Sequence, residues 1–401
     1  MRVAGIVCEY NPFHNGHKYL IDKARSEFCA DYVVCAISSS FLQRGEPSIV
    51  SKHARAEMAV ASGADIVFEI PQVFSSRDAE TYARAGVAVL RGTNAVTDMV
   101  FGSEFDDTEF LSEAAAILEN PDERFTAALK QALSEGKSLA AAKGAALSNA
   151  LGSCAEKLGK PNVSLALSYI RALMRSSSGI VPHAVKRIGE DFGSESAGKL
   201  ASAAGIRRLI ASGNLSSAYE SMPKEAFEIL EREIREGRIL SLKAYRAALS
   251  CALSKQTHAE AQSLVDVSEG LENYIYKALA KPWQSAAELT GKAKTRRYTA
   301  GRLNRFLSST MLGLTKDLAA SVIDVPYLRL LAMKKEAAPL MKLIRRSASL
   351  PVITKPAQFE ASSDSERLSR IIDARGQDIW SSIIESPLPM GEDFRKSPVI
   401  L

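Results

Sequence analysis

Short apolar runs alternate with amphipathic segments through the first hundred residues of the chain. Near-continuous apolar runs, typical of strands buried on both faces, occur at residues 2–8, 31–38, 65–71 and 95–104. Apolar positions at helical spacing fill the segments between them, at residues 15–28, 51–63 and 75–92. Because buried strands that alternate with helices form parallel sheets, the pattern predicts an α/β fold in which helices cover a parallel sheet.

Strand signals become rare further along the chain. One more strand is predicted at residues 179–189 and one more helix at 202–213, whereas residues from about 216 onward are almost wholly helical in pattern. A chain of 401 residues is also too long for one ordinary core. We therefore expect two domains, an α/β domain at residues 1–215 and an α-rich domain at residues 216–401.

The composition is that of a globular protein, with 46% hydrophobic and 24% charged residues. No apolar run approaches the roughly 18 residues of a membrane span, and the N-terminus lacks the features of a signal peptide, so the expected location is cytoplasmic. Five scattered cysteines without a CxxC pair argue against a disulfide framework and a zinc site, and we predict no metal site. The net charge of +5 permits an anionic partner.

The first predicted strand is followed by NPFHNGH, and the two common nucleotide signatures are absent. No GxGxxG follows that strand, and GSCAEKLGKP has the wrong spacing for a P-loop. If a helix begins near Asn15, the imidazoles of His14 and His17 lie on one side of its first turn, and Gly16 leaves the backbone accessible. Such a helix start, with its free N–H groups, predicts a cradle for the phosphates of a nucleoside triphosphate.

An HxGH motif at this position is similar to the nucleotidyltransferase superfamily that includes class I aminoacyl-tRNA synthetases and pantetheine-phosphate adenylyltransferase. More narrowly, the chain resembles the bacterial tRNA(Met) cytidine acetate ligases. The resemblance covers nearly the whole chain, through GIVCEYNPFHNGH, SSSFLQRGEPSIVSKHARAEMAVASGADIVFEIP, FGSE, KPNVSLALSYIRAL, VKRIG and ASAAGIRRLI, in that order. It implies a Rossmann-like nucleotidyltransferase domain followed by an α-helical, tRNA-binding C-terminal domain.

The resemblance also implies an activity. The family uses ATP and acetate to make acetyl-adenylate and then acetylates N4 of cytidine 34 in the anticodon of elongator tRNA(Met), forming N4-acetylcytidine. The implied partners are tRNA(Met), acetate and ATP, the last with Mg²⁺. The preferred carboxylate, the base for the cytidine amine, the oligomeric state and the groups that hold Mg²⁺ are left open by the sequence.

Site residues follow from the resemblance by position. His14 and His17 are the expected catalytic residues. The expected ATP-binding residues are Val7, Cys8, Glu9, Tyr10, Asn11, Pro12, Phe13, His14, Asn15, Gly16, His17, Lys18, Tyr19, Leu20, Gly102, Asn162, Arg187 and Ile188. Ser202 and Arg207 resemble a second phosphate signature near a helix start. The plainer alternatives are a turn glycine for Gly102, a helix cap for Asn162 and a surface charge for Arg187.

Two further charged segments have alternative interpretations. Gln43, Arg44 and Glu46 are expected in a loop that either contacts substrate or tRNA or is held by an Arg44–Glu46 pair. Four charged or titratable residues open the predicted helix at 51–63, and we expect them to form a solvated face: Lys52, His53, Arg55 and Glu57. Alternatively, Lys52 and Arg55 contact phosphates or the tRNA end.

The chain departs from the family pattern at three places. Ser39 and Ser40 stand where the family usually has Gly and Asn, and Val163 stands where it has a second Asn. The segment 188–196 lacks an expected Tyr-His pair. These departures put details of the pocket in doubt, whereas the HxGH motif itself is intact.

A basic stretch without acidic residues lies between Glu288 and Asp317. We expect its cations to bind tRNA phosphates, with Tyr298 and Phe306 available for stacking, although a solvated helix face is the alternative. The predicted tRNA-binding residues are Lys292, Lys294, Arg296, Arg297, Arg302 and Arg305. A less specific basic cluster follows at Lys334, Lys335, Lys342, Arg345 and Arg346.

Two other classes of function stay open on these residues. The HxGH motif alone also fits an adenylyltransferase that joins AMP to a small phosphorylated metabolite, for which a basic helical half is unnecessary. A non-catalytic RNA-binding protein on the same scaffold is the other alternative. Substitution of His14 separates the enzymes from the binding protein.

Overall fold

An eight-stranded, mostly parallel sheet organises the computed structural model, which describes residues 1–152, 158, 160–187 and 201–401. Along the sheet the strands follow the order β5-β4-β1-β2-β3-β6-β7, and β8 pairs with β6. The first five strands are parallel: β1 (Val3–Cys8), β2 (Tyr32–Ser38), β3 (Ile66–Ile70), β4 (Asp98–Ser103) and β5 (Val181–Lys186). The predicted α/β class, with its parallel sheet, is confirmed.

Strands from the end of the chain complete this sheet. β6 (Leu328–Met333) pairs antiparallel with β3, and the short strands β7 (Val352–Ile353) and β8 (Val399–Ile400) pair parallel with β6. The expectation of an almost wholly helical pattern after residue 216 is therefore wrong at these strands. The division at residue 215 stays a prediction, but both of its parts contribute to one sheet.

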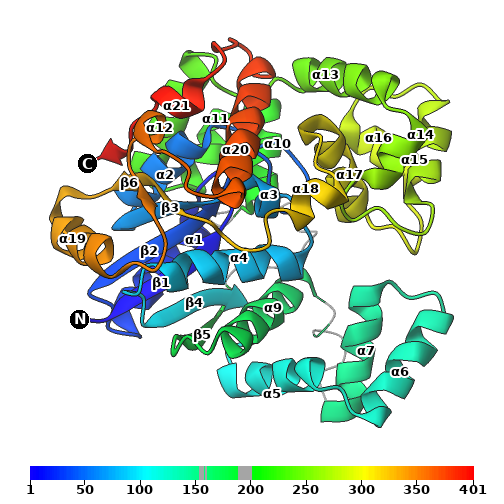
Figure 1. Cartoon of the computed structure of the whole chain (residues 1–401), viewed down its shortest axis with the longest axis horizontal. Coiled ribbons are helices and arrows are strands. Elements are labelled where there is room, and N and C mark those ends of the chain that lie inside the picture. The colour runs from blue at the N-terminus through cyan, green and yellow to red at the C-terminus, as the bar shows by residue number, and fades with distance from the viewer. Residues whose placement is uncertain (153–157, 159, 188–200) are drawn as a thin grey trace.

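Helices cover both faces of the sheet and form a separate lobe (Figure 1). In the first half they are α1 (Asn15–Ser26), α2 (Lys52–Ala61), α3 (Gln72–Ser75), α4 (Ala79–Gly92), α5 (Thr108–Glu119), α6 (Glu123–Ser134), α7 (Leu139–Leu151), α9 (Pro161–Ser176) and α10 (Ala203–Ala211). The later ones are α11 (Leu215–Glu220), α12 (Lys224–Arg235), α13 (Leu242–Lys255), α14 (His258–Ser263), α15 (Leu271–Leu279), α16 (Ala286–Ala293), α17 (Ala300–Leu312), α18 (Lys316–Ala320), α19 (Ala338–Ser347), α20 (Asp364–Ser382) and α21 (Glu392–Arg395), with 3₁₀ turns η1 (Lys335–Ala337) and η2 (Pro356–Gln358).

Alternate side chains of the strands enter two cores. On β1, Val3 and Val7 join the core under α4 and α9, whereas Ala4 and Ile6 join the core under α1, α2 and α12. This alternation explains why the strands are apolar throughout, since neither face is solvated. The sheet is thus a rigid layer whose carboxyl edge carries the loops that follow β1, β2 and β4.

The helical lobe, α13 to α17, has its own core, in which Tyr298 and Phe306 are buried. Figure 1 shows this lobe to one side of the sheet, on the side opposite α19. Tyr298 also donates a hydrogen bond from its hydroxyl to the carbonyl of Glu269 (2.6 Å). The expectation that these two rings are available for stacking on bases is therefore wrong, because packing of the lobe occupies them.

Within the described ranges, no helix is both long and apolar enough to cross a bilayer. Cys8, Cys29, Cys35 and Cys251 are free thiols, and Cys154 lies outside the described residues.

Candidate active site

The β1–α1 junction is built around a helix cap made of two histidines. His14 is the N-cap of α1, and its Nδ1 accepts a hydrogen bond from the N–H of Gly16 (3.0 Å). In return, Nδ1 of His17 accepts one from the N–H of His14 (3.2 Å). This reciprocal pattern is a capping box with histidines in place of the usual Ser or Thr and Glu. The prediction that a helix begins at Asn15 is confirmed.

The same two bonds determine which ring nitrogen carries the proton. Because each Nδ1 accepts a hydrogen bond, each neutral ring has its proton on Nε2, which is left as a donor. The rings stack with their centroids 3.7 Å apart, His14 being buried and His17 half-buried. Burial, and then the nearby Arg187, lower the pKa of His14 to about 3. Burial, His14 and Arg187 likewise hold the pKa of His17 well below its usual value. Both rings are therefore neutral Nε2–H donors near pH 7.

Gly16 has a different neighbour from the one expected. A Cβ at this position would lie 2.9 Å from Cε1 of His14, closer than ordinary packing allows. The absence of a side chain thus gives room to the capping imidazole. The predicted approach of a nucleotide to the Gly16 backbone stays a prediction.

Buried contacts hold the loop that leads to His14. Phe13 is fully buried, and its ring packs edge-on against Tyr10 with the centroids 4.7 Å apart. Oδ1 of Asn11 accepts a hydrogen bond from the N–H of Ile49 (2.7 Å), and the carbonyl of Asn11 accepts one from Nη1 of Arg207 (2.8 Å). These contacts position the loop before any ligand binds.

The ends of β4 and β5 bring Gly102 and Arg187 to the histidines. A Cβ on Gly102 would lie 3.3 Å from Cγ of Arg187, and the N–H of Arg187 donates to the carbonyl of Ser103 (3.0 Å). Gly102 lies within β4, so its alternative role as a turn glycine is wrong. The positive charge of Arg187 also lowers the pKa of both histidines.

Asn162 reaches the same edge of the sheet through a carboxylate that sequence reasoning did not single out. Its Nδ2 donates to Oε1 of Glu104 (3.0 Å), just after β4. The N-cap of α9 is Lys160, so the alternative that Asn162 is a cap is wrong. Glu104 is the last residue of FGSE, and its position in this motif was the signal that could have identified it.

Ser202 and Arg207 lie at the start of α10. Ser202 is the N-cap, and its Oγ accepts a hydrogen bond from the N–H of Gly205 (3.3 Å). Besides the carbonyl of Asn11, Arg207 contacts Oε2 of Glu46 (3.3 Å). The alternative pairing of Glu46 with exposed Arg44 is thus replaced by a contact with Arg207, and the phosphate role of α10 stays a prediction.

The remaining ATP-loop residues differ in their surroundings. Val7 and Cys8 end β1, and Tyr19 and Leu20 pack against the core under α1. Lys18 forms an ion pair with Asp22 (2.5 Å), one turn along α1. Ile188, together with the departure at 188–196, lies outside the described residues.

The charged start of α2 is buried, which corrects the default of a solvated face. Lys52 and Arg55 have exposed fractions of 0%. Lys52 forms ion pairs with Glu69 and Asp393 (both 2.6 Å). His53 is also buried, whereas Glu57 forms an ion pair with Arg232 of α12. The ion pairs of Lys52 with Glu69 and Asp393 explain how its charge is accommodated in the interior.

The departures at Ser39 and Ser40 have a structural explanation. Oγ of Ser39 donates to Oε1 of Glu69 (2.6 Å), and Oγ of Ser40 donates to Oε1 of Gln377 of α20 (2.9 Å). Both hydroxyls therefore join the loop after β2 to buried polar groups of the sheet and of the C-terminal part.

The basic stretch is only partly free to meet an anion. Lys292 pairs with Glu288, and Arg297 pairs with Glu269. Arg302 donates to Oγ of Ser268, and Arg305, 15% exposed, lies 3.6 Å from Asp266. Lys294 and Arg296 are exposed and form no ion pair with a described residue. The tRNA-binding role of all six stays a prediction, for which Lys294 and Arg296 are the best placed.

The second basic cluster lies at the opposite edge of the sheet from the histidines. Met333 at the end of β6 pairs with Ile66 at the start of β3, so α19 follows at the edge where the parallel strands begin. Its exposed cations, Lys342, Arg345 and Arg346, are therefore remote from the HxGH loop.

No three His, Cys, Asp or Glu side chains within the described ranges are grouped to hold a metal ion. Oε1 of Glu9 and Oε2 of Glu104 are buried, and neither has a hydrogen-bond partner among the residues that the structure describes. The described site thus combines neutral imidazoles, a guanidinium and main-chain N–H groups, which are suited to phosphate oxygens, with the carboxylates of Glu9 and Glu104.

Known proteins share both this fold and this sequence along the full chain. The pattern of the HIGH Nucleotidyl Transferase family matches residues 1–392. The tRNA(Met) cytidine acetate ligase of Fervidobacterium nodosum is 36% identical over 362 residues, which are 90% of this chain and 85% of that protein. The ligase of Acetivibrio thermocellus is 34% identical over 416 residues, covering all of both chains. The chain belongs to the tRNA(Met) cytidine acetate ligase family.

A solved structure from the tRNA(Met) cytidine acetate ligase family agrees with this membership. The crystal structure of Thermotoga maritima TmcAL bound with alpha-thio ATP is 31% identical, with a TM-score of 0.90 over the whole of both chains. The family and the α/β fold with a helical C-terminal region, both expected from the sequence, are confirmed. For the individual site residues, support comes from the geometry described above.

Proposed function

We propose that this chain is an ATP-dependent ligase that activates acetate and transfers the acetyl group to N4 of cytidine 34 in elongator tRNA(Met). A carboxylate oxygen of acetate attacks the α-phosphorus of ATP, and pyrophosphate leaves, giving acetyl-adenylate. The N4 amine of the cytidine then attacks the acetyl carbonyl carbon. The bond to AMP breaks, the amine loses a proton, and N4-acetylcytidine and AMP are the products.

The stacked, neutral pair His14 and His17 is the observation that carries this proposal. The Nδ1 atom of each ring accepts a main-chain hydrogen bond, so the Nε2–H group of each ring is the one that can donate to a ligand. Both rings lie at the N-terminus of α1, where Arg187 lowers their pKa. Donors fixed in advance stabilise charge that develops on phosphate oxygens without reorganisation during the reaction. Being neutral, the rings do not lose a proton as the phosphate charge changes.

Each remaining group at this edge has a proposed part. Arg187 contacts phosphates, and the nucleotide passes over Gly102, where a side chain would collide with the arginine stem. Asn162, fixed by Glu104, hydrogen-bonds to the nucleotide. Mg²⁺ comes with ATP and neutralises its phosphates when bound, since no described cluster is suited to hold the ion.

The acceptor is proposed to be RNA because of the full-length relatives and the exposed cations of the helical lobe. Lys294 and Arg296 supply charge for the phosphate backbone, and the cytidine of an anticodon loop is unpaired, so its base edge is already largely accessible. An adenylyltransferase of small metabolites needs no such lobe. The small-metabolite alternative therefore has less support, and the exchange assay tests the non-catalytic one.

An exchange assay tests the first half-reaction separately from RNA. Purified protein, ATP, Mg²⁺, acetate and labelled pyrophosphate should yield labelled ATP without tRNA, and omission of acetate should abolish the signal. Exchange that depends on a phosphorylated metabolite and not on acetate would support the small-metabolite enzyme. If no carboxylate supports exchange at saturating ATP, either with or without tRNA, the proposed adenylate is contradicted.

A further inference from the structure

Arg55 bridges the ends of two neighbouring parallel strands at the proposed active site. Its Nη1 donates to the carbonyl of Glu9 (2.6 Å), and its Nη2 donates to the carbonyl of Ser39 (2.6 Å). Glu9 directly follows β1, and Ser39 directly follows β2. One guanidinium thus joins the first residue of the HxGH loop to the first residue of the next loop.

The guanidinium is suited to fix this separation. It is planar, and its N–H groups diverge at constant angles, so two carbonyls bound at once are held at a set distance. The exposed fraction of Arg55 is 0%, so its two bonds to the carbonyls are shielded from solvent. A lysine has a single nitrogen on a flexible stem and reaches both carbonyls less well.

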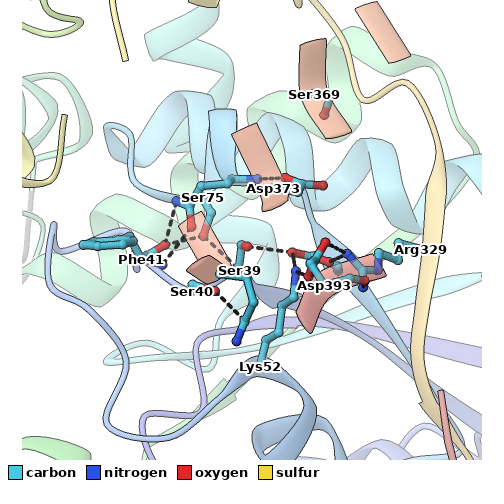
Figure 2. A network of polar contacts seen from close by, with 12 residues as sticks. Ser39, Ser40, Phe41, Lys52, Ser75, Arg329, Ser369, Asp373 and Asp393 are labelled. Carbon is cyan, nitrogen blue, oxygen red and sulfur yellow. Dashed lines mark hydrogen bonds and ion pairs between the residues drawn. The ribbon is translucent and has the colours of Figure 1, made fainter. Parts of the chain in front are cut away.

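The Ser39 side of this bridge is itself held in place. The N–H of Ser39 donates to Oγ of Ser75 (3.0 Å), and its hydroxyl donates to Glu69. Figure 2 shows how this contact continues into a buried network with Lys52 and Asp393. Ser39 is therefore a fixed support against which Arg55 holds the Glu9 side.

No described carboxylate forms an ion pair with Arg55, although its charge is buried. Burial lowers the pKa of Arg55 to about 10, against the opposing attraction of the Glu9 and Glu69 carboxylates, and no described group forms a hydrogen bond with its buried Nε. A buried cation that donates to two carbonyls, and that no described carboxylate pairs with directly, costs stability that an apolar side chain would not. This cost points to a requirement at the loop rather than to stabilisation of the core.

We propose that Arg55 is a positioning residue for the adenylate-forming step, an inference that rests on the proposed function. By binding the carbonyls of Glu9 and Ser39 together, Arg55 fixes the position at which the loop to His14 and His17 begins. Arg55 does not contact the nucleotide. It acts through the main chain that leads to the two imidazoles.

Arg55→Lys and Arg55→Ala test this assignment, with Arg232→Ala as the matched control. Arg232 of α12 donates two hydrogen bonds to the carboxylate of Glu57, which lies on α2 as Arg55 does. This pair lies away from the HxGH loop. We expect the Kd for ATP, measured by calorimetry, to rise roughly tenfold in both Arg55 variants because a charged hydrogen-bond donor is removed or displaced. Millimolar methylguanidine should restore ATP affinity to Arg55→Ala, and the control should bind ATP as the wild type does.

A second variant covers the case in which the Arg55 variants do not fold. Ser75→Ala removes the acceptor for the Ser39 N–H without leaving a buried charge, and a rise in the Kd for ATP of roughly two- to fivefold is expected. Unchanged ATP affinity in a folded Arg55→Lys protein, or in Ser75→Ala, would overturn the assignment. Because ATP binding is measured directly, wild-type protein that binds ATP but shows no acetate-dependent exchange would count against the proposed function and not against Arg55.

Discussion

The imidazole rings of His14 and His17 stack with their centroids 3.7 Å apart. The His14 ring caps the N–H of Gly16, and the His17 ring caps the N–H of His14. The bonds at the two Nδ1 atoms fix the tautomers, so each ring carries its proton on Nε2 and is a hydrogen-bond donor there. A motif of four residues thereby encodes a helix start, a ring orientation and a protonation state. The clearance at Gly16 is part of the same device.

Loss of one of these donors should affect the chemical step strongly. We expect His14→Ala to lower the rate of acetate-dependent pyrophosphate exchange by about 10² to 10³, as for other fixed donors to developing negative charge. The affinity for tRNA, measured by filter binding, should stay within about twofold.

His258→Ala is the matched control for this variant, because His258 is exposed on α14 in the helical lobe. It should keep wild-type exchange. Wild-type exchange in His14→Ala would instead mean that the capping role is the whole function of this histidine.

The low pKa of His14 makes stability depend on pH in a predictable direction. An unfolded chain binds a proton at this side chain near its usual pKa of 6.5, whereas the folded protein binds one only near about 3. Between these values the unfolded state holds more protons, so stability is complete above about 6.5 and decreases as the pH falls. Melting temperatures at pH 7.5 and 5.0 should differ less in His14→Gln than in the wild type. An equal decrease in both proteins would contradict a buried, neutral His14.

Glu104 should matter through the orientation of Asn162. Without its carboxylate the Asn162 amide is free to rotate, so Glu104→Ala should raise the KM for ATP by roughly tenfold while changing kcat less. Asp106→Ala, an exposed acidic residue two positions further on, serves as the control. If kcat falls in Glu104→Ala and the KM stays constant, the carboxylate acts on the reaction itself.

The two basic surfaces make opposite predictions for RNA. Charge reversal at Lys294 and Arg296 should weaken tRNA binding and reduce the slope of log K against log salt by about 0.7 to 0.9 for each phosphate that the protein no longer neutralises. The same reversal at Arg345 and Arg346, at the remote edge of the sheet, changes the net charge equally and should leave both quantities unchanged. Equal losses of affinity in the two proteins would indicate a nonspecific effect of total charge.

The local parts of this structure were predictable from the sequence because local signals encode them. The strand before Glu9, the helix start at Asn15 and the Ser51 cap of α2 all follow from apolar runs and capping residues. The placement of Gly102 and Arg187 near the ends of predicted strands follows in the same way, whereas the pairing of these two strands does not.

Long-range pairing was not predictable in the same way. Lys52 and Arg55 look like the solvated start of a helix, and partners distant in the sequence make them interior: Glu69 and Asp393 for Lys52, and the ends of β1 and β2 for Arg55. Strand β6 is a single apolar run among helices, and its place beside β3 depends on an antiparallel pairing that no local pattern specifies. Tyr298 and Phe306 show that aromatic residues between cations are first of all core residues.

The nucleoside composition of tRNA(Met) tests the central claim most directly. After incubation of unmodified tRNA(Met) with the protein, ATP, Mg²⁺ and ¹³C-acetate, mass spectrometry should find labelled N4-acetylcytidine at position 34, and omission of ATP or the His14→Ala change should prevent its formation. Unmodified cytidine at position 34, with protein shown to bind both ATP and the tRNA, would contradict the account.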